Sequence, residues 1–277
     1  MSVPYFYKNA NSRFISIEGE DSSEFLQNLI TNDIKKCNNK NILYSCLLSP
    51  QGKFNSDFFI FKIYEKFILE TNSFFYEKLF KTLSLYKLRS KIFIREIKNI
   101  SSYSIFGEVK MEEDFIVFNI DPRNNNIGKK LIHDSANLQM LSNFTEINEK
   151  KYHEILIKNT VPLSHYDLEE NKSLLLENNF ENLNAISWDK GCYIGQEITA
   201  RMKYRALLKR RIYSLKLKEG SPKNQQSIIE KESQLGKIIS IENKFILAML
   251  KIEIAEEKIK LHQTIKTIDG LVLDFVI

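Results

Sequence analysis

The stretch Trp188–Arg201, WDKGCYIGQEITAR, is the most informative part of this sequence. The chain has only 9 glycines in 277 residues, yet Gly191 and Gly195 stand four positions apart here. Glycine permits positive φ and close backbone approach, so the pattern predicts a tight loop that lines a ligand. The residues that follow have helical propensity, so we expect the loop to lead into the N-terminus of a helix.

Cys192 lies between these two glycines. A helix N-terminus and the neighbouring Lys190 would both lower the pKa of its thiol and so increase the thiolate population near neutral pH. The alternative is an inert, buried Cys192 in a loop whose glycines only shape a turn. No histidine lies nearby in the sequence, which disfavours a Cys–His nucleophile pair. The spacing alone leaves the reactive and the inert interpretation equally open.

The composition is that of a globular protein, with 43% hydrophobic and 27% charged residues, and it excludes disordered and fibrous classes. The net charge of +5 permits a polyanionic partner without requiring one. Three cysteines without CxxC spacing and four scattered histidines indicate a reducing compartment and no zinc site. No apolar leader follows a basic start, and no apolar run approaches ~18 residues. We therefore expect a cytoplasmic protein without a membrane segment.

The first half of the chain alternates between helix and strand patterns. Asp21 and Glu24 have the spacing of a capping box before a helical stripe. Pro50–Gln51–Gly52 predicts the turn of a β-hairpin. The expected elements are a strand, a turn at Gly19 and a helix over 14–34, two strands over 41–63, a strand over 66–71, a helix capped near Asn72 or Ser73 over 72–88, and a strand over 91–97. This interleaving predicts an α+β fold.

The second half is less regular. Residues 121–130 read as a polar, turn-rich link, residues 150–159 as a helix, and residues 160–180 as irregular chain. From Lys209 onward, short strands separated by turns predict a small all-β barrel or open sandwich. We expect residues 1–120 and 150–208 to form an α+β region of two interleaved small domains, and residues 209–277 to form a β-barrel-like C-terminal domain.

The segment KGCYIGQE resembles the signature K-G-C-[FY]-x-G-Q-E of the YgfZ family of folate-binding proteins. The match continues into ITARMKYRALLKRR and departs at Ala206, where many members carry glycine. Upstream, three segments resemble the amino-terminal half of that family in the right order: GEDSSEFLQNLITNDI, LLSPQGKFNSDFFIF and LYKLRSKIFI. The resemblance covers most of the chain, and the strands after Gly220 are its least distinctive part.

The family shares its fold with the aminomethyltransferase (T-protein) of the glycine cleavage system. The resemblance implies three small domains around a central cavity for tetrahydrofolate or a derivative. It also implies a role in iron–sulfur cluster assembly or repair, with client proteins and assembly factors as partners and an indirect effect on tRNA modification. Direct nucleic-acid binding is not firmly implied. Whether the protein is an enzyme stays open, and the alternatives are a tetrahydrofolate-dependent aminomethyltransferase and a non-catalytic folate-binding scaffold.

Several residues follow from the resemblance as candidate contacts of the folate. A carboxylate can accept both adjacent N–H donors of a pterin, and the resemblance implies Glu177 in that role and Asp57 near the N5/N10 edge. The alternatives are a solvated helix face for Glu177 and a strand-end charge for Asp57. Cys192, with Lys190 beside it, is expected near the one-carbon end of the ligand. The other expected contacts are Tyr193, Gln196, Glu197, Arg201 and Arg205.

Six cations fall within the eleven residues 201–211. They could clamp the glutamate tail of folate, contact phosphates, or form a solvated helix face. Arg201 and Arg205 lie four apart, hence on one helical face next to the loop, and are the strongest candidates for the clamp. Three cysteines without cluster spacing argue against a permanent iron–sulfur cluster in this chain.

Overall fold

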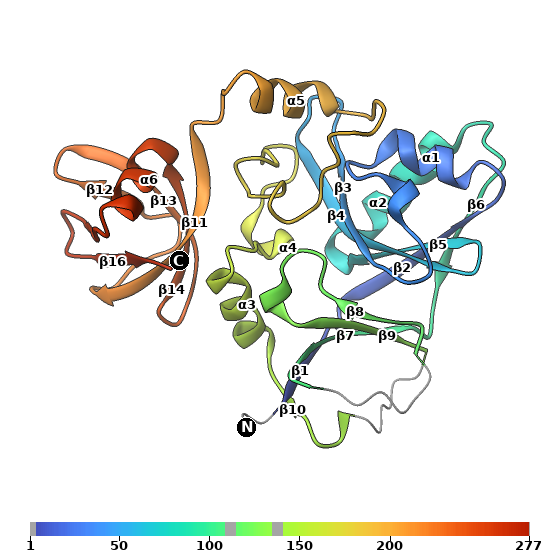
Figure 1. Cartoon of the computed structure of the whole chain (residues 1–277), viewed down its shortest axis with the longest axis horizontal. Coiled ribbons are helices and arrows are strands. Elements are labelled where there is room, and N and C mark those ends of the chain that lie inside the picture. Colours follow the sequence, from blue (N-terminus) through green and yellow to red (C-terminus); the bar gives the residue numbers. More distant parts are fainter. Residues whose placement is uncertain (1–3, 109–114, 135–140, 277) are drawn as a thin grey trace.

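The computed structural model describes residues 4–108, 115–134 and 141–276, and their strands form three sheets (Figure 1). The first sheet is antiparallel, in the order β3-β4-β5-β2-β6. Apolar faces of α1 and α2 pack against this sheet, because both helices place buried residues at helical spacing. Its elements are β2 (Ser12–Glu18), α1 (Ser22–Leu29), β3 (Leu43–Leu48), β4 (Phe54–Ile63), β5 (Lys66–Asn72), α2 (Ser73–Lys87) and β6 (Phe93–Ile97).

The second sheet has the order β10-β1-β7-β9-β8 and is antiparallel except for the β1–β10 pair. Two 3₁₀ turns, η1 (Ile34–Lys36) and η2 (Asn125–Ile127), lie in the connections of the first two sheets. The strands are β1 (Tyr5–Lys8), β7 (Ser101–Phe106), β8 (Val117–Ile120), β9 (Lys129–His133) and β10 (Thr145–Glu146).

Three helices follow, and α3 lies between the C-terminal strands and the other two sheets (Figure 1). Their bounds are α3 (Glu149–Lys158), α4 (Ser164–Asp167) and α5 (Gln196–Tyr204). The largest core cluster joins this central segment to the first two sheets and contains the buried aromatic rings of Tyr44, Phe54 and Phe180. Among the described residues, no helix is long and apolar enough to cross a membrane.

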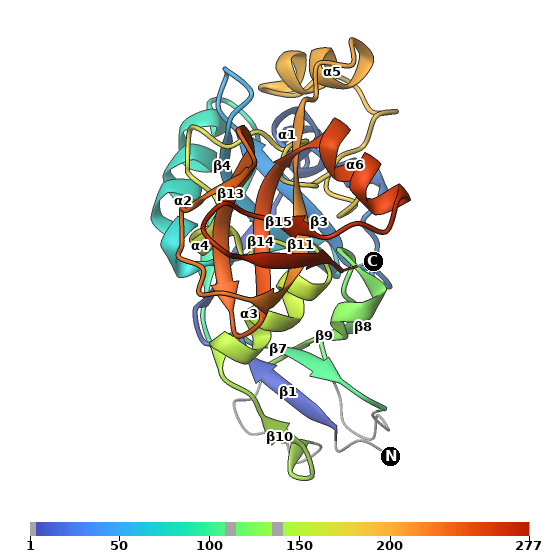
Figure 2. The ribbon, with the colours of Figure 1, turned by 90° about the vertical axis from the view of Figure 1, so that its left-hand side faces the viewer.

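The third sheet has the order β12-β13-β14-β11-β16-β15 and curves into the shape of a barrel (Figure 2). The N–H of Ile268, just after β15, donates to the carbonyl of Ile229 in β12, so the two edge strands nearly meet. The elements are β11 (Arg210–Glu219), β12 (Ser227–Glu230), β13 (Ser233–Glu242), β14 (Phe245–Lys251), α6 (Ile252–Lys260), β15 (Ile265–Lys266) and β16 (Val272–Phe275). The α+β class and the β-rich C-terminus are confirmed. All six strands of this sheet lie between Arg210 and Phe275.

Local signals in the first half are mostly confirmed, including the hairpin at Gly52 and the cap at Asn72, whose side chain accepts the N–H of Phe74. The prediction of a capping box at Asp21 and Glu24 is wrong. Asp21 makes no cap hydrogen bond and instead accepts the N–H of Lys91, because α1 begins where the chain packs against the start of β6.

The turn-rich link predicted over 121–130 is confirmed, since a turn and η2 connect β8 to β9. Asp121, Arg123 and Lys130 are all buried in this segment, and β9 begins at Lys129. A charged residue can be buried when it has a partner of opposite charge. Here Arg123 pairs with Asp121, and Lys130 pairs with Glu70. The short helix α4 lies inside the stretch predicted to be irregular.

Candidate functional site: a pocket between two sheets

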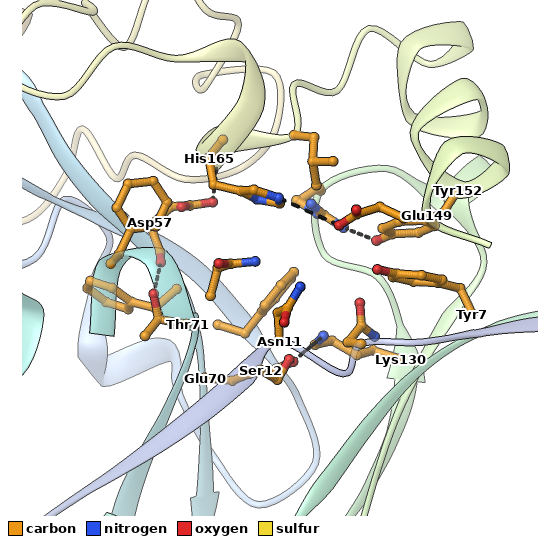
Figure 3. A pocket seen from close by; sticks show the side chains of 18 residues that line it. Tyr7, Asn11, Ser12, Asp57, Glu70, Thr71, Lys130, Glu149, Tyr152 and His165 are labelled. Carbon is orange, nitrogen blue, oxygen red and sulfur yellow. Dashed lines mark hydrogen bonds and ion pairs between the residues drawn. The ribbon is translucent and has the colours of Figure 1, made fainter. Parts of the chain in front are cut away.

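A pocket lies where the first and second sheets meet beneath α3 and α4 (Figure 3). The cavity volume is about 80 Å³, and the pocket is open to solvent. Small-molecule sites are usually lined by aromatic groups and a few fixed polar groups, and this pocket has such a lining. The labelled side chains in Figure 3 come from β1, β2 and the turn between them, and from β4, β5, β9, α3 and α4.

Asp57 on β4 is a carboxylate of the pocket that two hydroxyl groups hold in place. Its Oδ2 atom accepts hydrogen bonds from the Tyr44 hydroxyl at 2.5 Å and from the Ser164 hydroxyl at 2.6 Å. Burial, and then the nearby Asp57 charge, raise the pKa of Tyr44 well above its ordinary value, so the phenol keeps its proton and donates it. These bonds fix the carboxylate in orientation before any ligand arrives.

The floor of the pocket contains two buried ion pairs. Arg123 Nη2 lies 2.8 Å from Asp121 and also donates to the Tyr152 hydroxyl at 3.0 Å. Lys130 Nζ lies 2.9 Å from the Glu70 carboxylate. Both cations also lie over the ring of Phe59, with Arg123 Cζ 4.9 Å and Lys130 Nζ 4.1 Å from the ring centre. Each cation is thus already matched by a carboxylate of the protein, so the floor is close to neutral.

The opposite wall combines aromatic rings with a second carboxylate (Figure 3). Tyr7 stacks on Tyr152 with ring centres 4.4 Å apart. Glu149 lies 3.6 Å from Nε2 of His165. Burial and the charge of Glu149 raise the pKa of Tyr7, which therefore remains a neutral donor. The pocket offers flat apolar faces and two carboxylates, Asp57 and Glu149, on different walls.

The glycine motif packs elsewhere, against the β3–β4 turn. Gly195 has φ +81°, and a Cβ there would lie 2.4 Å from the carbonyl oxygen of Ser49. A Cβ on Gly52 would lie 2.9 Å from the carbonyl oxygen of Gly195. Only glycine at both positions lets the two backbones come this close. A Cβ on Gly191 would meet nothing within 4 Å, so packing does not require glycine there.

Lys190 anchors the motif to the first sheet. Its Nζ atom donates to the backbone carbonyls of Gln27, Ile30 and Asn32 at 2.7, 2.7 and 2.9 Å. These carbonyls lie at and just beyond the C-terminal end of α1, where a cation is favoured. Burial lowers the pKa of Lys190 to about 8. The sequence predicted Lys190 to act as a cation beside the thiol. In the structure its three N–H donors hold the backbone instead.

Cys192 is exposed, whereas Cys37 and Cys46 are buried. It is not among the residues that line the pocket, and neither is any other residue of its loop. The loop contacts the turn at Gly52, and Asp57 lies five residues farther along an extended strand, or about 17 Å. The structure thus presents the thiol to solvent and outside the lining of the pocket.

The other predicted contacts also lie outside the pocket lining. Tyr193 is buried in the main core, where Gln196 accepts its N–H. Glu197 pairs with Arg201 at 3.1 Å on the exposed face of α5.

Arg205 is exposed just beyond the end of α5. Glu177 lies near the start of the barrel, with its carboxylate 3.6 Å from Arg210 and its carbonyl accepting the N–H of Ile212. Of the predicted folate contacts, only Asp57 lines the pocket.

Sequence reasoning missed most of the pocket. The missed residues come from segments predicted as a strand, a helix, a link or irregular chain, and from the N-terminal residues, to which no element was assigned. The signal that could have exposed them is the presence of charged or aromatic residues with apolar neighbours, as in VPLSHY and DPRNNNIGKK. The principal missed residues are Tyr7, Asn11, Glu70, Arg123, Lys130, Glu149, Tyr152, Ser164 and His165.

Comparison with known proteins gives a consistent picture. Residues 10–107 match the family described as the GCVT N-terminal domain. The iron–sulfur cluster assembly factor IBA57 homologue of Neurospora crassa is 28% identical over 227 residues, which cover 74% of this chain and 52% of that protein. IBA57 of Mus musculus is 25% identical over 233 residues, covering 75% and 65%. The chain thus spans about half to two-thirds of the length of these relatives.

Among solved structures, the glycine cleavage system aminomethyltransferase T from Bartonella henselae superposes with a TM-score of 0.71 at 10% sequence identity. The likeness covers 99% of this chain and 84% of that one, and it shows the fold. The expectation of a cytoplasmic location is contradicted, because the relatives are named as mitochondrial proteins. Residues 10–107 are thus similar to the GCVT N-terminal domain, the chain has IBA57 iron–sulfur cluster assembly factors among its relatives, and its fold is that of a T-protein.

Proposed function

We propose that this protein is a folate-binding accessory factor for iron–sulfur cluster assembly or repair. The observation that carries the proposal is the preoriented carboxylate of Asp57 in a pocket of the GCVT-type fold. The names of the homologues support the iron–sulfur part of the role. An effect on tRNA modification would be indirect and would follow from the loss of an iron–sulfur client enzyme.

The residues of the pocket fit a reduced pterin. A pterin presents adjacent N–H donors and a flat ring, and the pocket offers the carboxylates of Asp57 and Glu149 together with the stacked rings of Tyr7 and Tyr152. When bound, a tetrahydrofolate would supply a one-carbon carrier. Asp57 would orient it, and Tyr44 and Ser164 would hold Asp57 in place.

The exposed loop has a separate part in this proposal. Cys192 faces solvent, so we assign its thiol to a protein partner, as a transient ligand of iron or a redox group, rather than to the folate. Residues 196–211, which begin at α5, carry six cations and one anion, and glutamates from outside this range pair with Lys203, Arg210 and Arg211. A client protein or assembly factor with an acidic surface would be attracted to this side of the molecule.

Calorimetry with 5-formyltetrahydrofolate, a stable reduced folate, tests the pocket. Asp57→Asn should weaken binding about tenfold or more, because a charged hydrogen-bonding partner is lost. Glu177→Gln is the matched control, since Glu177 lies outside the pocket, and it should bind like the parent. No detectable binding by the parent protein at millimolar ligand would favour a plain scaffold and contradict the proposal.

Rescue of iron–sulfur enzyme activity in a deletion strain tests the loop. Cys192→Ser should fold and bind folate normally yet fail to rescue. Cys37→Ser removes a thiol that is buried in the core of the first sheet, away from the loop, and serves as the cysteine control. Full rescue by Cys192→Ser would remove the thiol from the mechanism.

The second candidate is a tetrahydrofolate-dependent aminomethyltransferase. The shared fold with aminomethyltransferase T and the fixed Asp57 in the pocket favour it. A glycine cleavage assay with purified partner proteins separates the two functions. Robust ammonia release that depends on tetrahydrofolate would establish this candidate in place of the accessory role.

A further inference from the structure

His153 is buried on α3 and contacts a carboxylate on each side. Its Nε2 atom lies 3.1 Å from Asp167 Oδ2 on α4, and its Nδ1 atom lies 3.4 Å from Glu242 Oε1 on β13 of the barrel. A neutral imidazole has one donor and one acceptor, so both contacts are satisfied as hydrogen bonds only when the ring carries two protons. Burial lowers the pKa of His153, but the two carboxylates more than offset this, and the net pKa is raised.

Asp167 continues the connection toward the pocket. The same Oδ2 atom accepts the N–H of Leu163 at 2.6 Å, which closes the single turn of α4. That turn presents two pocket residues. Ser164 donates to Asp57 at 2.6 Å, and His165 lies 3.6 Å from Glu149 (Figure 3). The position of α4 therefore sets how Asp57 is held.

We propose that protonated His153, by bridging Glu242 and Asp167, couples the C-terminal barrel to the pocket and keeps α4 in its pocket-forming position. The barrel contributes no residue to the lining of the pocket in the described part of the chain. Through this bridge it nevertheless controls the hydroxyl that orients Asp57. His153, Asp167 and Glu242 are positioning residues, and their role does not depend on which ligand the pocket takes.

The titratable groups around His153 come from three elements. On α4 they are Asp167 and Tyr166, whose ring centre lies 5.7 Å from that of His153, and on β13 the group is Glu242. The next residue on its own helix, Glu154, is already paired with Lys151 and Lys158 and accepts from Asn243 beyond β13, and these contacts lower its pKa to about 2 despite burial.

Because the folded pKa of His153 is raised, the bridge contributes full stability below the unfolded value of about 6.5. That contribution is lost as pH rises through the folded pKa. The coupling should therefore weaken above neutral pH.

Hydrogen exchange on the full chain without ligand tests the bridge. The readout is the protection of the amides of residues 163–168, compared at pH 6 and pH 8.5 after correction for intrinsic exchange. In the parent, protection should fall toward pH 8.5. In His153→Gln, exchange at pH 6 should rise about tenfold, the factor expected for a lost charge-assisted hydrogen bond, and the pH dependence should flatten.

Glu242→Gln keeps the shape of the barrel and should give a smaller rise in the exchange rate of the same amides. This variant tests the bridge even if His153→Gln does not fold. Glu232→Gln changes an exposed glutamate in the turn before β13 and should leave α4 unchanged. Parental protection of α4 in Glu242→Gln, or a rise confined to the barrel, would overturn the coupling. Because no folate is present, this result is independent of whether the pocket binds folate.

Discussion

The pocket and the glycine motif are built in opposite ways. In the pocket, side chains from distant segments hold one another through buried ion pairs and short hydrogen bonds, as Asp57 is held by Tyr44 and Ser164. In the motif, glycine backbones and the ammonium of Lys190 hold the loop, and the thiol of Cys192 stays outside. A strong sequence signature can thus mark the scaffold that displays one residue, while the candidate binding pocket lies elsewhere.

The largest effect is expected from Gly195→Val. The side chain would meet the Ser49 carbonyl, and a β-branched residue tolerates φ +81° poorly. We expect a loss of about 3 kcal/mol or more in the free energy of unfolding, measured by urea denaturation. Gly191→Ala is the matched control, since a Cβ there meets nothing within 4 Å, and it should change stability little. Equal losses for both variants would show that the contrast within the motif is mistaken.

Lys190→Met should have the next largest effect. The substitution keeps much of the buried stem but leaves three backbone carbonyls without their donor. A loss of about 2–3 kcal/mol in unfolding free energy is expected for a charged hydrogen-bonding group of this kind. Lys209→Met, at an exposed position, provides the control. If Lys190→Met unfolds at the same urea midpoint as the parent protein, Lys190 does not anchor the loop, and a chemical role for it is favoured instead.

Ser164→Ala tests the pocket side of the comparison, and its expected effect, on ligand affinity, is smaller. It removes one of two hydroxyl donors to Asp57 without removing the carboxylate. Affinity for 5-formyltetrahydrofolate should fall about fivefold, in line with a loss of about 1 kcal/mol for one hydrogen bond. Calorimetry would measure it beside Asp57→Asn. A larger loss for Ser164→Ala than for Asp57→Asn would mean that the hydroxyl, not the carboxylate, contacts the ligand.

The sequence predicted the parts of the fold that depend on local signals. The hairpin turn at Gly52 and the cap at Asn72 are set by residues within a few positions of one another. The pocket depends on partners far apart in the chain. Lys130 looked like a link residue because its partner, Glu70, lies 60 positions away. Whether such a pair is buried depends on the tertiary structure, and a run of polar residues in the sequence does not reveal it.

The motif was recognised correctly, but its residues could not be placed from spacing alone. The two glycines suggested a ligand-lining loop, and the contact they permit is with the backbone of Ser49 and Gly52. Glu177 stood among several other glutamates, and only the fold shows that its carboxylate points to Arg210 near the barrel. Asp57 was named from the family resemblance, and the structure places it on β4 in the lining of the pocket.

The separation of thiol and pocket can be tested by alkylation of the native protein with iodoacetamide, because Cys192 is exposed and the other two cysteines are buried. The rate at Cys192 should be measured with and without 5-formyltetrahydrofolate, at a concentration that calorimetry shows to saturate the pocket. Our account predicts the same rate in both conditions. Strong protection by the folate, abolished in Asp57→Asn, would show that ligand and thiol share one site and would contradict it.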